Sequence, residues 1–214
     1  MAFEKNKPFK NISGAFPKEW EEDINCVCTE LVPTLKPFSY GNKDKYYLSS
    51  GAVELPYRCY NKPLSQFQFG RFTERQKKIF ACICLLNYNG FVRERYLRYL
   101  LEQPLEEWIL PFLMKVSGEY VKEILIVLYE DRKDKDNTLF KEFSKMNPRQ
   151  SERNLSRMIS YWNEYYRFDI IRPCVRDGRK GARSDIRDYV GYSLFRECFG
   201  ISPRRKRVNN YDNN

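Results

Sequence analysis

The stretch TERQKKIFACICLLNYNGFVRERYLRYLL, residues 73–101, predicts two consecutive amphipathic helices. Thr73 and Gln76 form a capping box, in which each side chain accepts a hydrogen bond from the other residue's backbone N–H. Apolar residues then recur three and four positions apart until Asn89-Gly90 ends the first helix. A second apolar pattern runs from Phe91 to Glu102, so the stretch predicts a pair of helices joined by a tight turn.

Two further helical patterns follow this pair. Pro104 can begin a third helix, although Pro111 inside it should kink or split the segment. A fourth helix is predicted from Glu119 to Asp131. Its start, Tyr120-Val121-Lys122-Glu123, matches Phe91-Val92-Arg93-Glu94 at an offset of 29 residues, as repeats in helical solenoids do. Ordinary helical hairpins can also produce such a match by chance.

The region before residue 73 is less regular. A helix is predicted to begin near Pro17 and to end at the prolines at 33 and 37. The segment that follows contains Gly, Pro, Asn and aromatic residues without a lasting helical period. Within it, Tyr46 to Leu48 and Ala52 to Leu55 could pair as short strands.

The C-terminal third begins with a charged stretch. Residues 131–137 are nearly all charged, which predicts a linker to a more basic part of the chain. A short helix is predicted over Leu139 to Met146, and Ser151 is expected to cap a longer one. Residues 172–185 form a Gly-containing basic loop, and a final helix is predicted from Ile186 to Phe199.

Together these patterns predict an all-α protein of stacked helical hairpins, either HEAT-like or an irregular bundle. The irregular N-terminal region could hold a short β-hairpin. The expected units are residues 1–72 as an N-terminal helix and irregular segment packed on the core, 73–131 as central helical hairpins, 138–202 as a basic helical part, and 203–214 as a mobile basic tail.

The charge is unevenly distributed. The chain carries 38 basic and 28 acidic side chains, net +10, and 15 basic residues stand against 8 acidic ones after residue 146. A basic half can attract nucleic acid, anionic lipid or an acidic protein, or can simply keep the surface soluble. Arginine binds phosphate oxygens as a bidentate fork. The candidate phosphate or nucleic-acid contacts are Arg176, Arg179, Lys180 and Arg183 in the basic loop and Arg204, Arg205, Lys206 and Arg207 in the tail.

No catalytic or metal site is predicted. The chain has no His, which removes the commonest general base and metal ligand. The pairs Cys26/Cys28 and Cys82/Cys84 lie in apolar helical patterns, so we expect buried, reduced thiols rather than zinc ligands. Glu119 and Glu123 could bind Mg²⁺ or act as acid and base, but interspersed lysines favour a solvated helix face. We therefore expect no cofactor.

The segment Tyr161-Trp162-Asn163-Glu164-Tyr165-Tyr166-Arg167 is rich in aromatic residues. Such side chains can stack on the bases of single-stranded nucleic acid. Trp162, Tyr165 and Tyr166 lie three and four positions apart, however, which is the spacing of a buried helix face. The spacing therefore favours packing in the core.

Four short motifs stand out along the chain: Leu55-Pro56-Tyr57-Arg58, Asn89-Gly90-Phe91-Val92-Arg93, Ser117-Gly118-Glu119-Tyr120-Val121 and Ser160-Tyr161-Trp162-Asn163-Glu164-Tyr165-Tyr166-Arg167. They resemble motifs of an uncharacterised family of bacterial helical proteins. They occur in a consistent order over about half of the chain, and the resemblance implies a shared helical fold but no known activity. Family members tend to have His just before the Gly-Tyr-Val-Arg-like step, where this chain has Tyr88 and Asn89, so no role of that His carries over. The Gly-Phe-Val-Arg step also resembles HEAT-type repeats, which serve as interaction scaffolds.

These features lead to a functional prediction. The N-terminus lacks the apolar core of a signal peptide, and no apolar run reaches the roughly 18 residues that span a bilayer. We therefore expect a cytoplasmic protein without a membrane partner, with residues 203–208 acting as a nuclear-import signal only in a eukaryotic cell. The leading prediction is a non-catalytic interaction or scaffold protein that binds another protein. The alternative is a nucleic-acid-binding protein that uses the basic loop and tail, and a third reading is an enzyme built from carboxylates alone.

Overall fold

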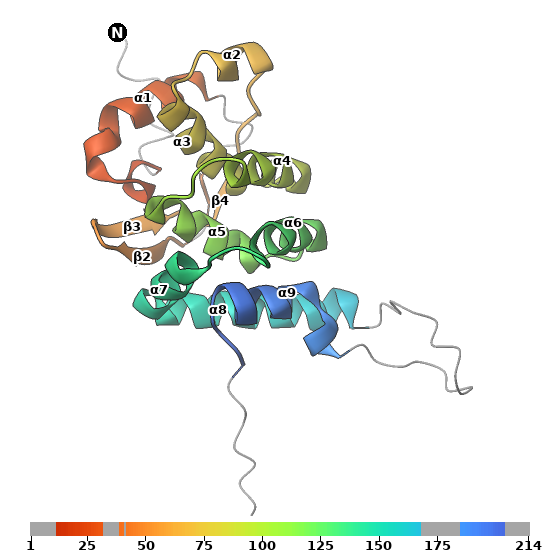
Figure 1. Cartoon of the computed structure of the whole chain (residues 1–214). Coiled ribbons are helices and arrows are strands. Elements are labelled where there is room, and N and C mark those ends of the chain that lie inside the picture. The colour runs from red at the N-terminus through yellow and green to blue at the C-terminus, as the bar shows by residue number, and fades with distance from the viewer. Residues whose placement is uncertain (1–11, 32–38, 41, 168–184, 204–214) are drawn as a thin grey trace, which may run out of the picture.

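The computed structural model describes residues 12–31, 39, 40, 42–167 and 185–203, which are mostly helical (Figure 1). The helices are α1 (Glu21–Glu30), α2 (Gln66–Gly70), α3 (Glu74–Leu85), α4 (Gly90–Leu101), α5 (Leu110–Ser117), α6 (Lys122–Arg132), α7 (Thr138–Met146), α8 (Pro148–Tyr161) and α9 (Val190–Ser193). The strands are β1 (Ser39–Tyr40), β2 (Asp44–Leu48), β3 (Gly51–Leu55) and β4 (Arg58–Cys59). Short 3-10 segments are Ser13–Ala15, Lys18–Trp20, Glu107–Ile109 and Ile186–Asp188, and π-helical segments are Trp162–Tyr166 and Leu194–Cys198.

The two helices predicted for residues 73–102 are confirmed as α3 and α4. The Thr73 hydroxyl accepts from the Gln76 N–H at 3.3 Å, and the Gln76 side chain accepts from the Thr73 N–H at 3.1 Å, so the predicted capping box is present. Asn89 begins α4, because its side-chain oxygen accepts from the Phe91 N–H at 2.9 Å. Local sequence signals therefore set both ends of this helix pair.

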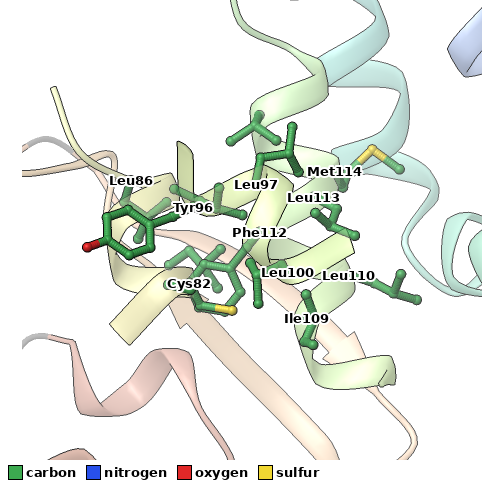
Figure 2. Close-up of a cluster of buried hydrophobic side chains, with 14 of the residues drawn as sticks. Cys82, Leu86, Tyr96, Leu97, Leu100, Ile109, Leu110, Phe112, Leu113 and Met114 are labelled. Atoms are coloured by element: carbon green, nitrogen blue, oxygen red, sulfur yellow. The ribbon is translucent and has the colours of Figure 1, made fainter. Parts of the chain in front are cut away.

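Two rows of helices lie side by side in Figure 1. In one row α4 contacts α6 and α6 contacts α9, and in the other α3 contacts α5 and α5 contacts α8. Figure 2 shows the apolar layer where α3, α4 and α5 meet. Its labelled side chains are Cys82, Leu86, Tyr96, Leu97, Leu100, Ile109, Leu110, Phe112, Leu113 and Met114. All ten are buried, so this layer forms the centre of a core that extends from Ile12 to Phe199.

The predicted strand pair is confirmed as an antiparallel hairpin of β2 and β3. Tyr46 pairs with Val53 and Leu48 pairs with Gly51, whose φ of 130° favours glycine at the end of the turn. Asp44, Tyr46 and Leu48 alternate with exposed residues, so one face of the hairpin is buried.

Asn147, between α7 and α8, fastens this hairpin to the helices. Its Oδ1 accepts from the Tyr47 N–H at 2.7 Å, and its Nδ2 donates to the carbonyl oxygens of Tyr47 at 2.9 Å and Phe143 at 3.0 Å. Asn147 is fully buried. Its amide thus takes the place that the backbone of a neighbouring strand would take beside β2.

Strand β4 links β1 to the turn that follows α3. It pairs with β1 in antiparallel fashion, and the Cys59 N–H donates to the Leu86 carbonyl at 2.8 Å. The Tyr88 N–H donates to the Cys59 carbonyl at 3.2 Å. These bonds hold the neighbouring residue Arg58 beside the turn between α3 and α4.

Three predicted helix starts are wrong. The third helix does not begin at Pro104, because α5 begins at Leu110 and Pro111 lies in its first turn, where its missing N–H costs nothing. The 3-10 segment Glu107–Ile109 precedes α5, so the segment is split near Pro111, as predicted. Helix α6 begins at Lys122 rather than Glu119, because the chain first turns at Gly118. Helix α8 begins at Pro148, because a proline in the first turn of a helix loses no backbone hydrogen bond. Ser151 therefore lies inside the helix and does not cap it.

The final helix, predicted from Ile186 to Phe199, is also wrong as a continuous element. The backbone of Tyr189 is extended, with φ −84° and ψ 130°, and it separates the 3-10 segment from α9. The π-helical segment Leu194–Cys198 then follows α9 directly. The apolar residues of this segment recur with a helical period, although the helix itself is interrupted. Packing of α9 against α6 and α8 fixes the backbone here.

Gly118, at the end of α5, lies too close to α8 to accept a side chain. A Cβ atom there would lie 2.5 Å from Oδ1, 3.0 Å from Cβ and 3.1 Å from Cα of Asn154. Asn154 is held in place because its Nδ2 donates to the Gln150 carbonyl at 2.9 Å. We expect Gly118→Ala to lower the free energy of unfolding by about 1–3 kcal/mol, measured by urea denaturation.

Gly70→Ala is the matched control for this substitution, because nothing lies within 4 Å of a Cβ at Gly70. An equal loss of stability in both variants would show that backbone freedom, rather than contact with Asn154, explains the result.

Candidate functional site

Glu119 is a carboxylate buried between three structural elements. It lies in the turn between α5 and α6, and its side chain is fully buried. Arg58 from β4 forms an ion pair with Oε2, and Nη2 of Arg157 on α8 lies 3.7 Å from Oε1. Burial alone would raise the pKa of Glu119, but the hydrogen bond and charge of Arg58 outweigh burial and hold the pKa below its ordinary value.

The predicted solvated face is therefore wrong for Glu119 and right for Glu123. Helix α6 begins only at Lys122, so Glu119 belongs to a turn that packs against β4 and α8. Glu123 lies in the first turn of α6 and is exposed. The two carboxylates do not form a pair.

Arg93 is the second buried charge at this junction. Its side chain is fully buried, and Nη1 donates to the carbonyl oxygens of Asn87 at 2.7 Å and Tyr88 at 3.1 Å. The guanidinium thus reaches back from α4 to the turn that precedes it. Nε and Nη2 have no hydrogen-bond partner among the described residues. The apolar pattern of residues 91–102 does not by itself indicate that Arg93 is buried.

A second buried ion pair lies beside the first. Nζ of Lys115, on α5, lies 2.5 Å from Oδ2 of Asp44 at the start of β2, and only 1% of the lysine side chain is exposed. Arg153 on α8 forms an ion pair with the other oxygen of Asp44. Burial lowers the pKa of Lys115, and the charge of Asp44 offsets only part of this effect.

The Tyr57 ring connects the two ion-pair groups. The centre of the ring lies 5.2 Å from Cζ of Arg58, 5.3 Å from Nζ of Lys115 and 5.5 Å from Cζ of Arg157. Cations at this distance are attracted to the negative face of an aromatic ring. The cation cluster, as we name it, contains Tyr57, Arg58, Arg93, Lys115, Arg153 and Arg157 with the carboxylates Asp44 and Glu119.

Aromatic side chains that are partly or largely exposed lie near this cluster, since Tyr120 is close to Arg93 and Tyr161 to Arg157. The Tyr120 ring centre lies 5.8 Å from that of Tyr161 and 6.2 Å from that of Tyr165, and the last two rings are stacked. Phe91 at the start of α4 is 84% exposed, and Tyr88 is also exposed. We call Tyr88, Phe91, Tyr120, Tyr161 and Tyr165 the aromatic face.

The starts of α4 and α6 bring these residues to one end of the molecule. A Cβ built at Gly90 would lie 3.4 Å from Cγ2 of Val121, so the two helix starts are in contact. The C-terminal end of α8 joins them, because the Tyr166 hydroxyl donates to the Tyr120 carbonyl at 2.6 Å. Tyr166 also stacks on Tyr189 at 5.4 Å, which adds the segment before α9.

The aromatic segment after α8 does not pack wholly in the core. Trp162 and Tyr166 pack against the core, as their spacing predicts, but Tyr165 is 58% exposed. Residues 162–166 form a π-helical segment, which shifts the side-chain positions away from the α-helical period. The prediction of a buried helix face is therefore wrong for Tyr165.

The predicted phosphate contacts fall outside the described residues. This applies to Arg176, Arg179, Lys180 and Arg183 in the basic loop and to Arg204, Arg205, Lys206 and Arg207 in the tail. The described residues before and after the loop lie close to each other, since the Tyr166 ring stacks on that of Tyr189.

Sequence reasoning missed the cation cluster, although a signal for it was present. The four motifs that resemble a bacterial helical family contain Tyr57, Arg58, Arg93, Glu119 and Tyr161. In the structure these motifs meet at one junction of β4, α4, α6 and α8. A set of Arg, Glu and Tyr in otherwise apolar motifs can thus indicate a buried polar network.

Metal and thiol chemistry are not indicated within the described residues. They contain no group of His, Cys, Asp and Glu that could hold a metal ion. Cys28, Cys82 and Cys84 are buried free thiols, whereas Cys26 is exposed. Burial raises the pKa of Cys28 to about 12, so this thiol is protonated near neutral pH. No helix in the described ranges is long and apolar enough to cross a membrane.

Comparison of the chain with models of protein families, with curated proteins and with solved structures finds no match. The resemblance to a bacterial helical family therefore stays a prediction.

Proposed function

We propose that this chain is a non-catalytic binding protein that holds a protein partner on the aromatic face. The observation that supports this proposal is the exposure of Phe91, Tyr120 and Tyr165 at one end of the molecule. Large aromatic residues supply much contact area with little loss of side-chain entropy, and they are common anchors in protein interfaces. A cluster of them exposed to water is better explained by a partner than by chance.

The arrangement of helices α3 to α6 is consistent with a binding role for the aromatic face. We also propose that α3 with α4 and α5 with α6 are stacked helical hairpins of an interaction scaffold, whose helix starts together present the aromatic side chains. Buried ion pairs at the same junction would hold Tyr120 and Tyr161 in fixed positions, because both lie next to arginines of the cation cluster. A rigid face loses less entropy when it binds.

A mutational test compares exposed aromatic residues at two places. We expect Phe91→Ala and Tyr165→Ala each to weaken binding of the partner by about tenfold or more, because anchor residues typically contribute over 1 kcal/mol. The partner is captured from cell extract with wild-type protein, purified, and titrated against each variant by calorimetry.

Phe67→Ala is the control. Phe67 is 77% exposed but lies on α2, at the top of Figure 1 and away from α6 and α8. Equal weakening by all three substitutions, or none by Phe91→Ala and Tyr165→Ala, would contradict the proposed face.

A single-stranded nucleic acid is the second candidate partner. It is favoured by the cations near the aromatic rings, since Nζ of Lys122 lies 5.5 Å from the centre of the Tyr166 ring. The sequence between Arg167 and Asp185 adds the basic residues predicted to contact phosphate. Fluorescence anisotropy with labelled single-stranded RNA and duplex DNA, at low and near-physiological salt, tests this candidate. Binding that falls steeply with salt and is lost in Tyr165→Ala would favour it over a protein partner.

An enzyme built from carboxylates is not favoured. Glu119 is fully buried and paired with Arg58, so it cannot readily exchange a proton with a substrate. Glu123 is exposed in the first turn of α6, and it does not pair with Glu119, which is buried in the preceding turn.

A further inference from the structure

Positive charge exceeds negative charge in the cation cluster. Arg58, Arg93 and Arg157 share the single carboxylate of Glu119, while Lys115 and Arg153 share that of Asp44. Three buried or largely buried arginines thus face one carboxylate at Glu119, whereas the extra cation at Asp44 is Arg153, which is half exposed to water. Buried charge without a counter-charge is costly, and the Tyr57 ring face compensates only in part. A further anion would balance the cluster.

Free hydrogen-bond donors in the cluster identify where an anion would bind. Nη2 of Arg157, and Nε and Nη2 of Arg93, have no acceptor in full hydrogen-bonding geometry among the described residues, although Tyr120 lies near Arg93 and Tyr161 near Arg157. Oε1 of Glu119, which also has no hydrogen-bond partner in the described structure, lies 3.7 Å from Nη2 of Arg157, which is too long for a hydrogen bond. Arg93 is fully buried, so these donors are shielded from bulk water as well. Such groups are rare in folded proteins and call for a partner.

A small anion could reach this place from the aromatic face. The side chains of Arg58 and Arg157 are 11% and 21% exposed, whereas Arg93 is fully buried. Tyr120 interacts with Arg93 and Tyr161 interacts with Arg157, so these two rings border the approach. Helix α6 begins just after Tyr120 without a side-chain cap, and its positive end adds attraction for an anion.

We propose that the cation cluster is a phosphate-binding site, in which Arg157 and Arg58 hold the phosphate oxygens and the fully buried Arg93 adds a third positive charge. Phosphate fits better than a single-charge anion, because it carries about one and a half to two negative charges near neutral pH and accepts several hydrogen bonds at once. The guanidinium groups match its oxygens in a bidentate geometry. The phosphate can be free or can be the terminal group of a small ester, since both present the same oxygens.

This site goes beyond the proposed binding function and does not depend on it. The aromatic face can bind a partner without an anion below it, and the anion site can be occupied without a partner. Phe91→Ala therefore serves as a cross-check, because it should weaken the partner complex and leave phosphate binding unchanged.

The test is titration of the full chain with inorganic phosphate by calorimetry, with sodium chloride at equal ionic strength as the reference. We expect wild-type protein to bind phosphate, Arg157→Gln to bind it about tenfold or more weakly, and Arg157→Lys to recover part of the loss. Arg149→Gln removes the same charge from an exposed position of the same helix and should have no effect. No phosphate binding by wild-type protein, or an equal loss in Arg149→Gln, would overturn the proposal.

Two further ligands distinguish the source and the chemistry. Tighter binding of phenyl phosphate than of inorganic phosphate would point to an ester whose aromatic group contacts Tyr120 and Tyr161, and the reverse order to free phosphate. Acetate should bind more weakly than either. Acetate that binds as tightly as phosphate would contradict a site for a doubly charged anion.

A measurement on wild-type protein covers the case in which Arg157→Gln does not fold. Phenylglyoxal modifies accessible arginine side chains, and mass spectrometry locates the modified residues. Phosphate should slow modification of Arg157 but not of the exposed Arg149. Equal rates at Arg157 with and without phosphate would count against the site.

Discussion

Replacement of Glu119 by Gln is expected to lower the free energy of unfolding by about 3–5 kcal/mol at pH 7. The substitution keeps the shape of the side chain but removes the negative charge that Arg58, Arg93 and Arg157 share. These cations cannot lose their protons near neutral pH, so they would remain buried without a counter-charge. Urea denaturation of the wild-type protein and the variant measures the difference.

The size of this effect should depend on pH in a defined direction. The pKa of Glu119 is held below its ordinary value, because Arg58 stabilises the charged form more than burial destabilises it. The ordinary pKa of a Glu side chain, 4.5, applies in the unfolded chain, so the carboxylate stabilises the fold fully above pH 4.5. This contribution is lost as the pH falls through the lower pKa of the folded state. The difference between wild-type protein and Glu119→Gln should accordingly shrink in acid.

Two variants make this test specific. Glu123→Gln removes a charge from the exposed first turn of α6 and should change stability by less than about 0.5 kcal/mol. Adding Arg157→Gln to Glu119→Gln removes one of the unpaired cations and should restore part of the lost stability. If the double variant lost as much free energy of unfolding as the two single variants together, unpaired buried charge would not explain the effect of Glu119→Gln.

The second large effect is expected from Asp44→Asn, which should lower the free energy of unfolding by about 3 kcal/mol at pH 7. It leaves Lys115 as a fully buried ammonium group without its carboxylate partner. Arg153 is half exposed and can turn toward water, so the cost arises mainly at Lys115. Thermal and urea unfolding of the variant measure this loss.

The pH dependence of this second variant should have the opposite sign. Burial lowers the pKa of Lys115 below its ordinary value of 10.5, and loss of Asp44 would lower it further. Between the folded and the unfolded pKa the unfolded chain binds more protons, so stability rises with pH in that window. The deficit of Asp44→Asn should thus decrease as pH rises toward 10.5, whereas that of Glu119→Gln decreases as pH falls.

Asp134→Asn provides the control, because Asp134 is exposed in the turn between α6 and α7. A deficit of Asp44→Asn that stays constant from neutral to alkaline pH would show that Lys115 does not lose its proton in the variant.

Local signals explain why part of this fold could be predicted. The ends of α3 and α4 depend on Thr73 with Gln76 and on Asn89, whose partners lie two or three residues away in the chain. The β2–β3 hairpin depends on alternation over a few residues. Such contacts can be read from sequence, because chain neighbours must also be neighbours in space.

Burial of charge could not be predicted in the same way. Glu119 is stabilised by Arg58, which lies 61 positions earlier, and Asp44 is paired with Lys115, which lies 71 positions later. Without these partners a charged residue between lysines is expected in solvent, and Glu119 was assigned accordingly. Tyr165 was misassigned because a π-helical segment replaced the regular period on which the prediction depended.

The hydrogen bonds between Asn147 and the Tyr47 backbone limit strand pairing between two molecules of this protein. The outer edge of a two-stranded hairpin has free backbone groups that can recruit a strand from another molecule, which begins aggregation. At Tyr47, however, both the N–H and the carbonyl of β2 are already bonded to the Asn147 amide. One buried side chain thus closes this part of the edge, so β2 cannot extend there into an intermolecular sheet while α7 and α8 stay in place.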